Sequence, residues 1–304
     1  MAYKKRPPPV NPVTRRWTEG RFFSDLDLEF SNKINCRGKK DRNECAIQRV
    51  CYFKDGKYVM FDEKNSKIKL FDRDFNFLLE SAVPADCRDM VYTNENEIAL
   101  TQKDGVIFVN VDDHRFRNSR KKFTFPENSQ GFGMASGRSR LFVTCDVMSV
   151  NASLRIIDMK GRMKVKVDSI KGLTENRDSG GYTRPFGKFL SISDQSIKAG
   201  SIYLSDTEGS RIVCCDLGGS FQWEVPMYDT PFGVTSVGDY VIMCLDSNQL
   251  GLIHKDGIFV KTFPEMHFKP KNLFFDVNKN KLLVTDSETS DFIYAYDIKI
   301  TQTK

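Results

Sequence analysis

The chain holds few of the residues from which enzyme and metal sites are built. It has three histidines in 304 residues, none at H-x-x-x-H spacing, and its eight cysteines include no C-x-x-C pair, a spacing typical of zinc ligands. Neither a G-x-S-x-G nucleophile elbow nor a phosphate-binding G-x-x-x-x-G-K-[ST] loop occurs. From these absences we expect no catalytic residues, no metal and no cofactor, and therefore a chain that is not an enzyme.

Long apolar runs are also lacking. No stretch of 18 apolar residues occurs, and the first 20 residues contain no apolar segment of the kind found in signal peptides. We therefore expect no membrane partner and a cytoplasmic protein, with the nucleus as the alternative. The cysteines fall mostly in or beside apolar runs, where cysteine serves as a small buried hydrophobe.

The first residues are basic and rich in proline. Residues 1–20 hold five Lys or Arg against one Glu, a net +4 in a chain whose total is +6. Such a composition buries too little apolar surface to fold, so we interpret residues 1–24 as an unstructured lead-in. The alternative is a nuclear-import or anion-binding patch.

What the chain has in quantity is internal repetition. The stretch GSIYLSDTEGSRIVCCDLGGSFQWE at 200–224 aligns without a gap on GKYVMFDEKNSKIKLFDRDFNFLLE at 56–80, pairing Asp206 with Asp62 and Arg211 with Lys67. Further copies place six anchors at positions 62, 102, 146, 206, 246 and 286. Each unit consists of short alternating apolar runs broken by Asp, Asn, Gly and Lys, a pattern typical of β-hairpins.

Units of about 40 residues with four short strands, repeated four to eight times, indicate a β-propeller. We therefore predict an all-β fold, a six-bladed propeller over residues 25–300 followed by a tail at 301–304. In the 200–224 unit we predict strands at 201–205, 211–216 and 221–225. The last unit stops after its third strand, near Ile298, so the alternating run at 26–30 should supply the fourth strand and close the ring. This pairing would cover two sheet edges that would otherwise template aggregation.

The spellings IYLSD…SRI…D and LLVTDS, together with Pro-Phe-Gly before a predicted inner strand, resemble NHL repeats. NHL propellers form the C-terminal domain of TRIM-NHL proteins, and the resemblance covers roughly residues 25 to 298. It implies a recognition domain, and several NHL propellers bind RNA. The RING and B-box patterns that would carry ubiquitin-ligase activity in TRIM-like proteins do not occur in this sequence.

The recurring aspartates have a structural interpretation. An Asp at the end of a strand accepts hydrogen bonds from the N–H groups of the following turn, which explains its recurrence in five of the six units. We assign this structural role to Asp62, Asp146, Asp206, Asp246 and Asp286. A remote alternative is a calcium-dependent hydrolase of the propeller class, for which Asp89, Asn272 and Gln48 on the inner strands offer oxygen ligands.

Function is expected on one face of the ring. With strands A to D running outward in each blade, the D-to-A and B-to-C connections emerge together on what we call the loop face, and recognition residues concentrate on such loops. A long Gly-rich connection at 171–187 is the strongest departure from the repeat. The candidate binding residues on the loop face combine cations with aromatic rings: Lys39, Lys40, Arg42, Arg88, Arg177, Tyr182, Arg184, Tyr228, Phe268, Lys269 and Lys271.

Two hypotheses follow for this face. Mixed charge with aromatic rings favours a non-catalytic module that binds a protein partner. The alternative is single-stranded RNA, which cations interleaved with aromatic rings would hold by phosphate contacts and base stacking.

Overall fold

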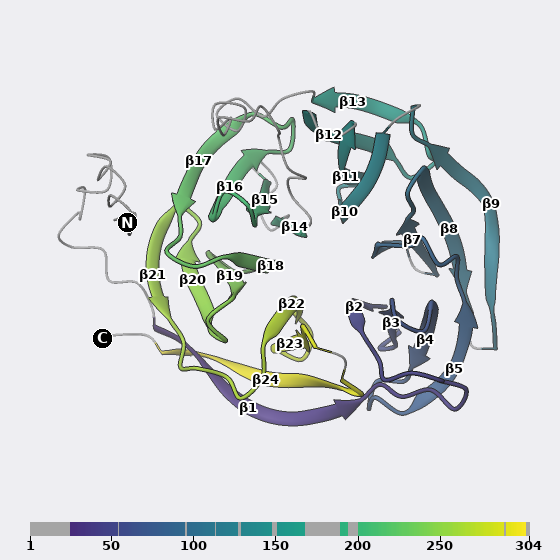
Figure 1. Ribbon diagram of the computed structural model, residues 1–304, viewed down its shortest axis with the longest axis horizontal. Helices are drawn as coiled ribbons and strands as arrows, with labels where there is room; N and C mark the ends of the chain where they lie inside the picture. The colour runs from purple at the N-terminus through teal and green to yellow at the C-terminus, as the bar shows by residue number, and fades with distance from the viewer. Residues whose placement is uncertain are drawn as a thin grey trace, which may run out of the picture.

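The structure, a computed structural model, describes residues 25–53, 55–94, 96–112, 114–126, 129–147, 151–167, 189–193, 200–288 and 290–301. Within these ranges it consists of twenty-four β-strands and no helix. Figure 1 shows the strands grouped into six blades around a central axis. The predicted six-bladed β-propeller is confirmed. No helix in the described chain is long and apolar enough to cross a membrane.

Each blade is a four-stranded antiparallel sheet whose strands follow one another from the axis outward. Blade 1 contains β2 (Ile47–Tyr52), β3 (Tyr58–Asp62), β4 (Lys67–Phe71) and β5 (Phe77–Ala82). Blade 2 contains β6 (Asp89–Asn94), β7 (Glu97–Thr101), β8 (Gly105–Val111) and β9 (Phe116–Thr124). Blade 3 contains β10 (Ser129–Gly137), β11 (Arg140–Val147), β12 (Asn151–Asp158) and β13 (Met163–Val167).

The second half of the chain repeats this order. Blade 4 contains β14 (Phe189–Ser193), β15 (Ser201–Asp206), β16 (Arg211–Asp216) and β17 (Phe221–Pro226). Blade 5 contains β18 (Pro231–Val237), β19 (Tyr240–Leu245), β20 (Leu250–His254) and β21 (Ile258–Thr262). Blade 6 contains β22 (Pro270–Asp276), β23 (Lys281–Asp286), β24 (Phe292–Thr301) and, from the other end of the chain, β1 (Asp25–Asn35).

The ring closes as the sequence predicts. Strand β1 pairs antiparallel with β24 in a register that runs from Asp25 opposite Thr301 to Asn35 opposite Phe292. The predicted run at 26–30 is confirmed, although the strand continues five residues further, to Asn35. Because the first and last strands share one sheet, blade 6 gains its outer strand only when both ends of the chain meet.

The core lies between neighbouring blades. Side chains alternate along each strand, so that one set packs on the preceding blade and the other on the following blade. Between blades 1 and 2, for example, Phe61 and Leu70 pack with Met90 and Ile98, all at most 1% exposed. All eight cysteines are buried and free, as expected for small core residues.

The turns between strands C and D are fixed by an aspartate at the end of strand C. Asp72, Asp158 and Asp216 each accept hydrogen bonds of 2.8–2.9 Å from the backbone N–H groups two and four residues further on. These side chains compete with strand hydrogen bonding and so end the strand. The turns lie on the face opposite the loop face, because the strands alternate in direction.

Candidate functional site

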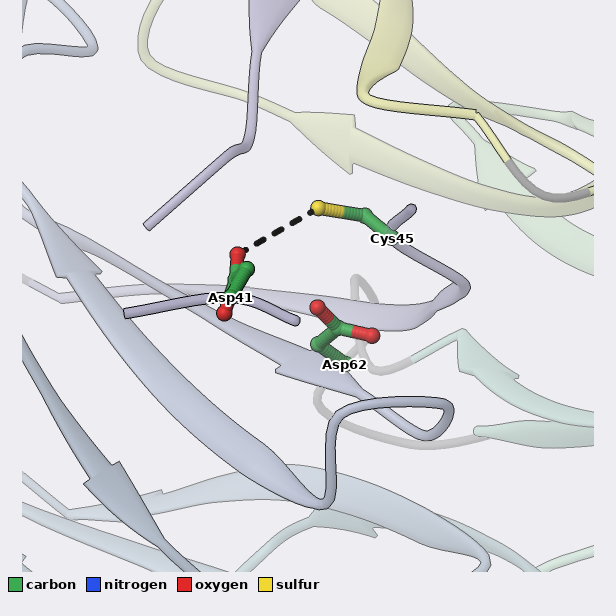
Figure 2. Close-up of side chains that lie close together, drawn as sticks. All are labelled: Asp41, Cys45 and Asp62. Carbon is green, nitrogen blue, oxygen red and sulfur yellow. Dashed lines mark hydrogen bonds between the residues drawn. The ribbon is translucent and has the colours of Figure 1, made fainter. Parts of the chain in front are cut away.

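The first D-to-A connection, residues 36–46, is tied to blade 1 by a buried cluster of charges. It leads from β1 to β2 and lies on the loop face. Its Asp41 meets Lys69 of β4, and both side chains are fully buried. The same ammonium group contacts Asp62 at the end of β3, which is also fully buried. Figure 2 shows Asp41 and Asp62 converging with Cys45 of the connection.

The geometry of this cluster resembles a cation site, and the cation is a lysine. The Asp41, Cys45 and Asp62 ligand atoms lie within 4.8 Å of one another, as three ligands of a metal ion would. Lys69 Nζ lies 2.6 Å from an oxygen of each aspartate, 3.2 Å from Cys45 Sγ and 2.9 Å from the Cys36 carbonyl oxygen. The ammonium group therefore occupies the position in which these groups would hold a metal ion.

The charges in the cluster hold one another in their ionised forms. Burial raises the pKa of Asp41, but hydrogen bonds from Lys67 and Lys69 outweigh it and hold that pKa below its usual value. Burial likewise raises the pKa of Asp62, and bonds from the Ala46 N–H and from Lys69 outweigh it. For Lys69, burial lowers the pKa, while the two aspartates raise it well above its usual value. At neutral pH the cluster is thus one ammonium between two carboxylates.

The rest of the connection is held by further hydrogen bonds and ion pairs. The Gly38 N–H donates to Asp41 at 2.6 Å, and Lys67 bridges Asp41 at 2.9 Å and Glu80 at 3.0 Å. A Cβ at Gly38 would lie 2.0 Å from Glu80 Oε2, so no larger residue fits there without displacing Glu80. On the other side, Asp291 accepts from the Cys45 N–H at 3.2 Å and from Arg37 at 2.7 Å.

This anchoring places three predicted binding residues in solvent. Lys39, Lys40 and Arg42 are exposed, and among the described residues their side chains contact no ion-pair or hydrogen-bond partner. They flank Asp41, whose side chain points inward. The chain thus alternates between an inward carboxylate that fixes the backbone and outward cations that remain free.

A second group of predicted residues lies on the loop face at blades 4 to 6. Tyr228, between β17 and β18, is fully exposed. Phe268 is 7% exposed and stacks on Tyr294 with ring centroids 3.7 Å apart, so it belongs to the core more than to the surface. Lys269 forms an ion pair with Asp246 and lies 6.0 Å from the centroid of Phe232.

The remaining predicted residues divide into two sets. Arg88 is half-buried and joins blade 2 to blade 3. It donates to the Gly131 carbonyl at 3.1 Å and to Gln130 at 3.0 Å, and its Cζ lies 4.6 Å from the centroid of the Phe132 ring. Lys271 is half-buried on β22. The long connection at 171–187, with Arg177, Tyr182 and Arg184, lies outside the described residues.

The repeat aspartates do not all occupy one position. Asp62, Asp206 and Asp286 each accept an N–H of the following turn, from Asn65 at 3.3 Å, Gly209 at 2.9 Å and Glu288 at 3.1 Å. Asp246 lies one residue beyond β19 and pairs with Lys269 instead, because the turn after β19 is one residue tighter. Asp146 is part of β11, but its side chain lies outside the described residues.

Among the described inner strands, two of the three candidate calcium ligands, Asp89 and Asn272, already have other partners. Asp89 accepts from Arg49 at 2.8 and 2.7 Å, and from the N–H groups of Met90 and Met134. Asn272 donates to the Gln48 carbonyl at 2.6 Å and accepts the Leu273 N–H at 2.9 Å. Both side chains are committed to tying inner strands together, and Asp89 is already neutralised by a buried guanidinium.

Sequence reasoning did not identify the buried Lys69 cluster or a second charged region. Lys69 is two residues from Lys67 in an alternating strand, and nothing local shows that its charge is buried against Asp41, 28 residues earlier. A local charge count would have revealed the other region: residues 114–126 and 138–167 hold twelve Lys or Arg against two Asp, a net +10 in a chain of +6.

Comparison with known proteins gives the fold. No protein-family model matches the chain and no curated protein matches it, so the NHL resemblance is not confirmed. Among solved structures, selenomethionine-substituted virginiamycin B lyase from Staphylococcus aureus is similar at a TM-score of 0.59 and 13% identity, covering 92% of this chain and 90% of that one. The luciferin-regenerating enzyme is similar at 0.60 and 11%, covering 84% and 92%. BBS1N in complex with ARL6DN is similar at 0.56 and 12%, covering 91% and 86%.

These comparisons correct one expectation. The absence of catalytic motifs predicted a chain that is not an enzyme, and that prediction is contradicted: a lyase and a luciferin-regenerating enzyme are among the similar structures. The motifs that the sequence lacks belong to other folds, so their absence says little about a propeller. At 11–13% identity the likeness establishes the fold and no particular reaction. The chain is a six-bladed β-propeller.

Proposed function

We propose that this propeller binds a protein partner on its loop face, centred on the connection 36–46. The observation that carries the proposal is the contrast within that connection. Asp41 is fully buried against Lys69, while Lys39, Lys40 and Arg42 on either side of it are exposed and free. The similar structure of BBS1N in complex with ARL6DN is of a propeller crystallised with a protein partner, which supports the proposal.

Burying three charges to hold a surface loop costs hydration free energy. A binding role for the loop would explain why such an arrangement is present. Each buried ion loses several kcal/mol of hydration, which is recovered only through well-made contacts with its partners. A loop held in one conformation loses little entropy when a partner binds, so its free cations contribute more to affinity. Tyr228 adds a fully exposed aromatic ring on the same face, and tyrosine is enriched among the residues that dominate binding energy.

The RNA alternative has weaker support from these contacts. It relied on six cations: Lys39, Lys40, Arg88, Arg184, Lys269 and Lys271. Arg88 is engaged by Gly131, Gln130 and Phe132, and Lys269 by Asp246. Two of its cations would have to leave existing partners before contacting phosphates.

Site-specific photocrosslinking in cells tests the proposal. A photoreactive amino acid at Tyr228 should yield crosslinked protein bands, and the same group at Val277 should not. Val277 is a matched control because it is 66% exposed on the opposite face, in the turn after β22.

A second variant assigns the bands to the anchored connection. Replacing Lys39, Lys40 and Arg42 with glutamine should abolish the Tyr228 bands. Neutralising three other exposed cations, Arg120 and Lys122 of blade 2 and Lys160 of blade 3 (R120Q/K122Q/K160Q), should leave the bands unchanged. Equal bands from Tyr228 and Val277 would show that the partner does not use this face. Tyr228 bands that survive K39Q/K40Q/R42Q would show that binding is not centred on the connection 36–46.

A further inference from the structure

The outer strand of blade 2 concentrates positive charge in a chain that is otherwise close to neutral. Residues 114–126, which contain β9, hold five Lys or Arg and no Asp or Glu. The whole chain carries +6, so the rest of it carries only +1. Ser119 lies in the middle of this segment, and no acidic residue lies within five positions of it in the sequence.

Protection of an open sheet edge does not explain this concentration. Charged residues, especially Lys, are commonly placed on edge strands to prevent aggregation. Such a device would appear in every blade, since each blade has an outer edge. Yet β9 contains four Lys or Arg in nine residues, whereas the equivalent strands β5 and β17 contain none.

Strand β9 also has a bulge that no other outer strand has. Ile107 and Val109 of β8 pair with Lys122 and Asn118 of β9, so residues 119–121 lie together opposite Phe108 alone. In each of the other five outer strands only a single residue is left unpaired. Large bulges re-aim side chains, and this one carries Ser119 at its start.

The bulge has a fixed shape and leaves a hydroxyl group available. Lys121 Nζ contacts Glu97 Oε1 of β7 at 2.8 Å, and the Glu97 side chain is only 3% exposed, so the bulge is tied to the blade. Ser119 is half-buried, and its Oγ accepts the Lys121 N–H at 3.2 Å. Within the described chain this hydroxyl group donates no hydrogen bond.

The cations around Ser119 are only partly neutralised. Arg117, two positions before it, pairs with Asp112 at 3.1 Å. Arg120 and Lys122, one and three positions after it, are exposed and form no ion pair with any described residue. Ser119 therefore has cations on both sides in the sequence, two of which are free.

Ser139 in blade 3 is a natural comparison, because it too has arginines on both sides. It lies between Arg138 and Arg140 and is exposed. However, Arg138 and Ser139 have φ values of 48° and 58°, in the left-handed region, and form the tight turn between β10 and β11. Ser139 cannot become extended without breaking that turn, whereas Ser119 already lies in an extended strand on the outside of the molecule.

We propose that Ser119 is a phosphorylation site for a serine/threonine kinase that selects cations around its target. A kinase recognises a serine in an accessible segment partly through the charges that flank it. In the transfer, Ser119 Oγ forms a bond to the γ-phosphorus of ATP and the bond from that phosphorus to the ADP oxygen breaks. The hydroxyl proton passes to the aspartate base of the kinase.

The surroundings of Ser119 suit the product as well as the reaction. A phosphoserine carries about −1.5 to −2 charge at neutral pH and three acceptor oxygens. Arg120 and Lys122 are free to form charge-assisted hydrogen bonds with it, so the phosphate meets attraction and not repulsion. The modification reduces the charge of residues 114–126 from +5 to about +3. This site lies outside the connection 36–46 and does not depend on the function proposed for it.

Phosphorylation of the full chain in vitro tests the proposal. The chain is incubated with ATP and the catalytic domain of protein kinase A or protein kinase C, and phosphate at each serine is quantified by tandem mass spectrometry. Ser119 should be modified and Ser139 should not. R117Q/R120Q should lower kcat/KM for Ser119 by about tenfold, as expected when two exposed charge pairs with the kinase are lost. The matched variant R138Q/R140Q should leave it unchanged.

Three outcomes would overturn the proposal. The first is no phosphate at Ser119 with either kinase. The second is modification of Ser139 to the same extent as Ser119, which would show that flanking arginines suffice and that the bulge has no role. The third is equal slowing by R138Q/R140Q and R117Q/R120Q, which would show that the kinase responds to the overall charge of the chain.

Discussion

Lys69 in blade 1 and Arg155 in blade 3 occupy the same place in their blades and have opposite surroundings. Each lies on the third strand, opposite a buried apolar residue of the second strand, Met60 and Val143 respectively. Each is at most 1% exposed and faces the preceding blade. Lys69 meets two carboxylates at 2.6 Å, whereas Arg155 meets a hydroxyl and a thioether.

The difference shows that blade position does not determine whether a buried charge is neutralised. Asp41, the more distant of the two carboxylates in the sequence, comes from the connection between blades 6 and 1 and not from the repeat itself. A charge buried together with its partners fixes a loop. A buried charge that has no counter-charge is a candidate binding group, because its hydration has been lost without compensation.

Removing the paired lysine should have the largest effect. Lys69→Met would leave Asp41 and Asp62 buried without a cation, and we expect a loss of about 3–5 kcal/mol in the free energy of unfolding. Urea denaturation followed by tryptophan fluorescence measures it. Lys67→Met is the matched control, since Lys67 is 16% exposed at its side chain and Asp41 would keep Lys69, so its loss should be clearly smaller. Equal losses would mean that the two lysines share one role.

Replacing Arg155 should change the free energy of unfolding in the opposite direction. Arg155→Met replaces a buried charge by an apolar side chain of similar length, and we expect the free energy of unfolding to rise by about 1–4 kcal/mol. Arg211→Met is the control: Arg211 pairs with Asp206 and Glu224, both at 2.8 Å, so its removal should destabilise. Destabilisation by Arg155→Met comparable to that of Lys69→Met would contradict the contrast between the two sites.

The smallest expected effect is on pH dependence. Burial raises the pKa values of Asp41 and Asp62, but hydrogen bonds outweigh it in the folded state. They come from Lys67 and Lys69 to Asp41, and from the Ala46 N–H and Lys69 to Asp62. Their contribution to stability is therefore complete above the unfolded-state pKa, about 3.9, and is lost as the pH falls through the lower folded-state values. Thermal unfolding between pH 6 and pH 2 should show this loss.

The variant Lys69→Met provides the comparison. Without the ammonium the folded-state pKa values of the two aspartates should rise, so the variant should lose less stability on acidification than the unmodified chain. A parallel pH dependence in both proteins would show that other carboxylates dominate acid unfolding.

The repeat and its strands could be predicted from local pattern. The predicted strand at 211–216 matches β16 (Arg211–Asp216), and those at 201–205 and 221–225 end one residue short of β15 and β17. Alternation of apolar and polar residues sets these strands because one residue of slip would turn every apolar side chain to the wrong face. Asp246 shows the limit: the alignment gave it the position of Asp62, but a tighter turn carries it past the strand.

The candidate sites depended on contacts that local pattern does not contain. Lys39, Lys40 and Arg42 were identified as exposed loop cations, but Arg88, Phe268 and Lys269, chosen by the same reasoning, have partners inside the protein. Their partners come from other blades or connections, so no window of sequence around them shows the pairing. The charge excess at residues 114–126 and 138–167 is visible in the sequence, but it falls largely outside the loop connections that the repeat pattern indicates as a binding face.

By itself the sequence determined the number of blades, the closure of the ring and the burial of the cysteines, because repetition and alternation are local and each blade needs the same packing on both sides. The tertiary structure alone decided which charges are neutralised. Lys67 and Lys69 look alike in the strand KIKLF, as do Arg155 and its basic neighbours in blade 3. Whether a charge is buried, paired or free depends on what lies opposite it across the seam between blades, and that is set by folding.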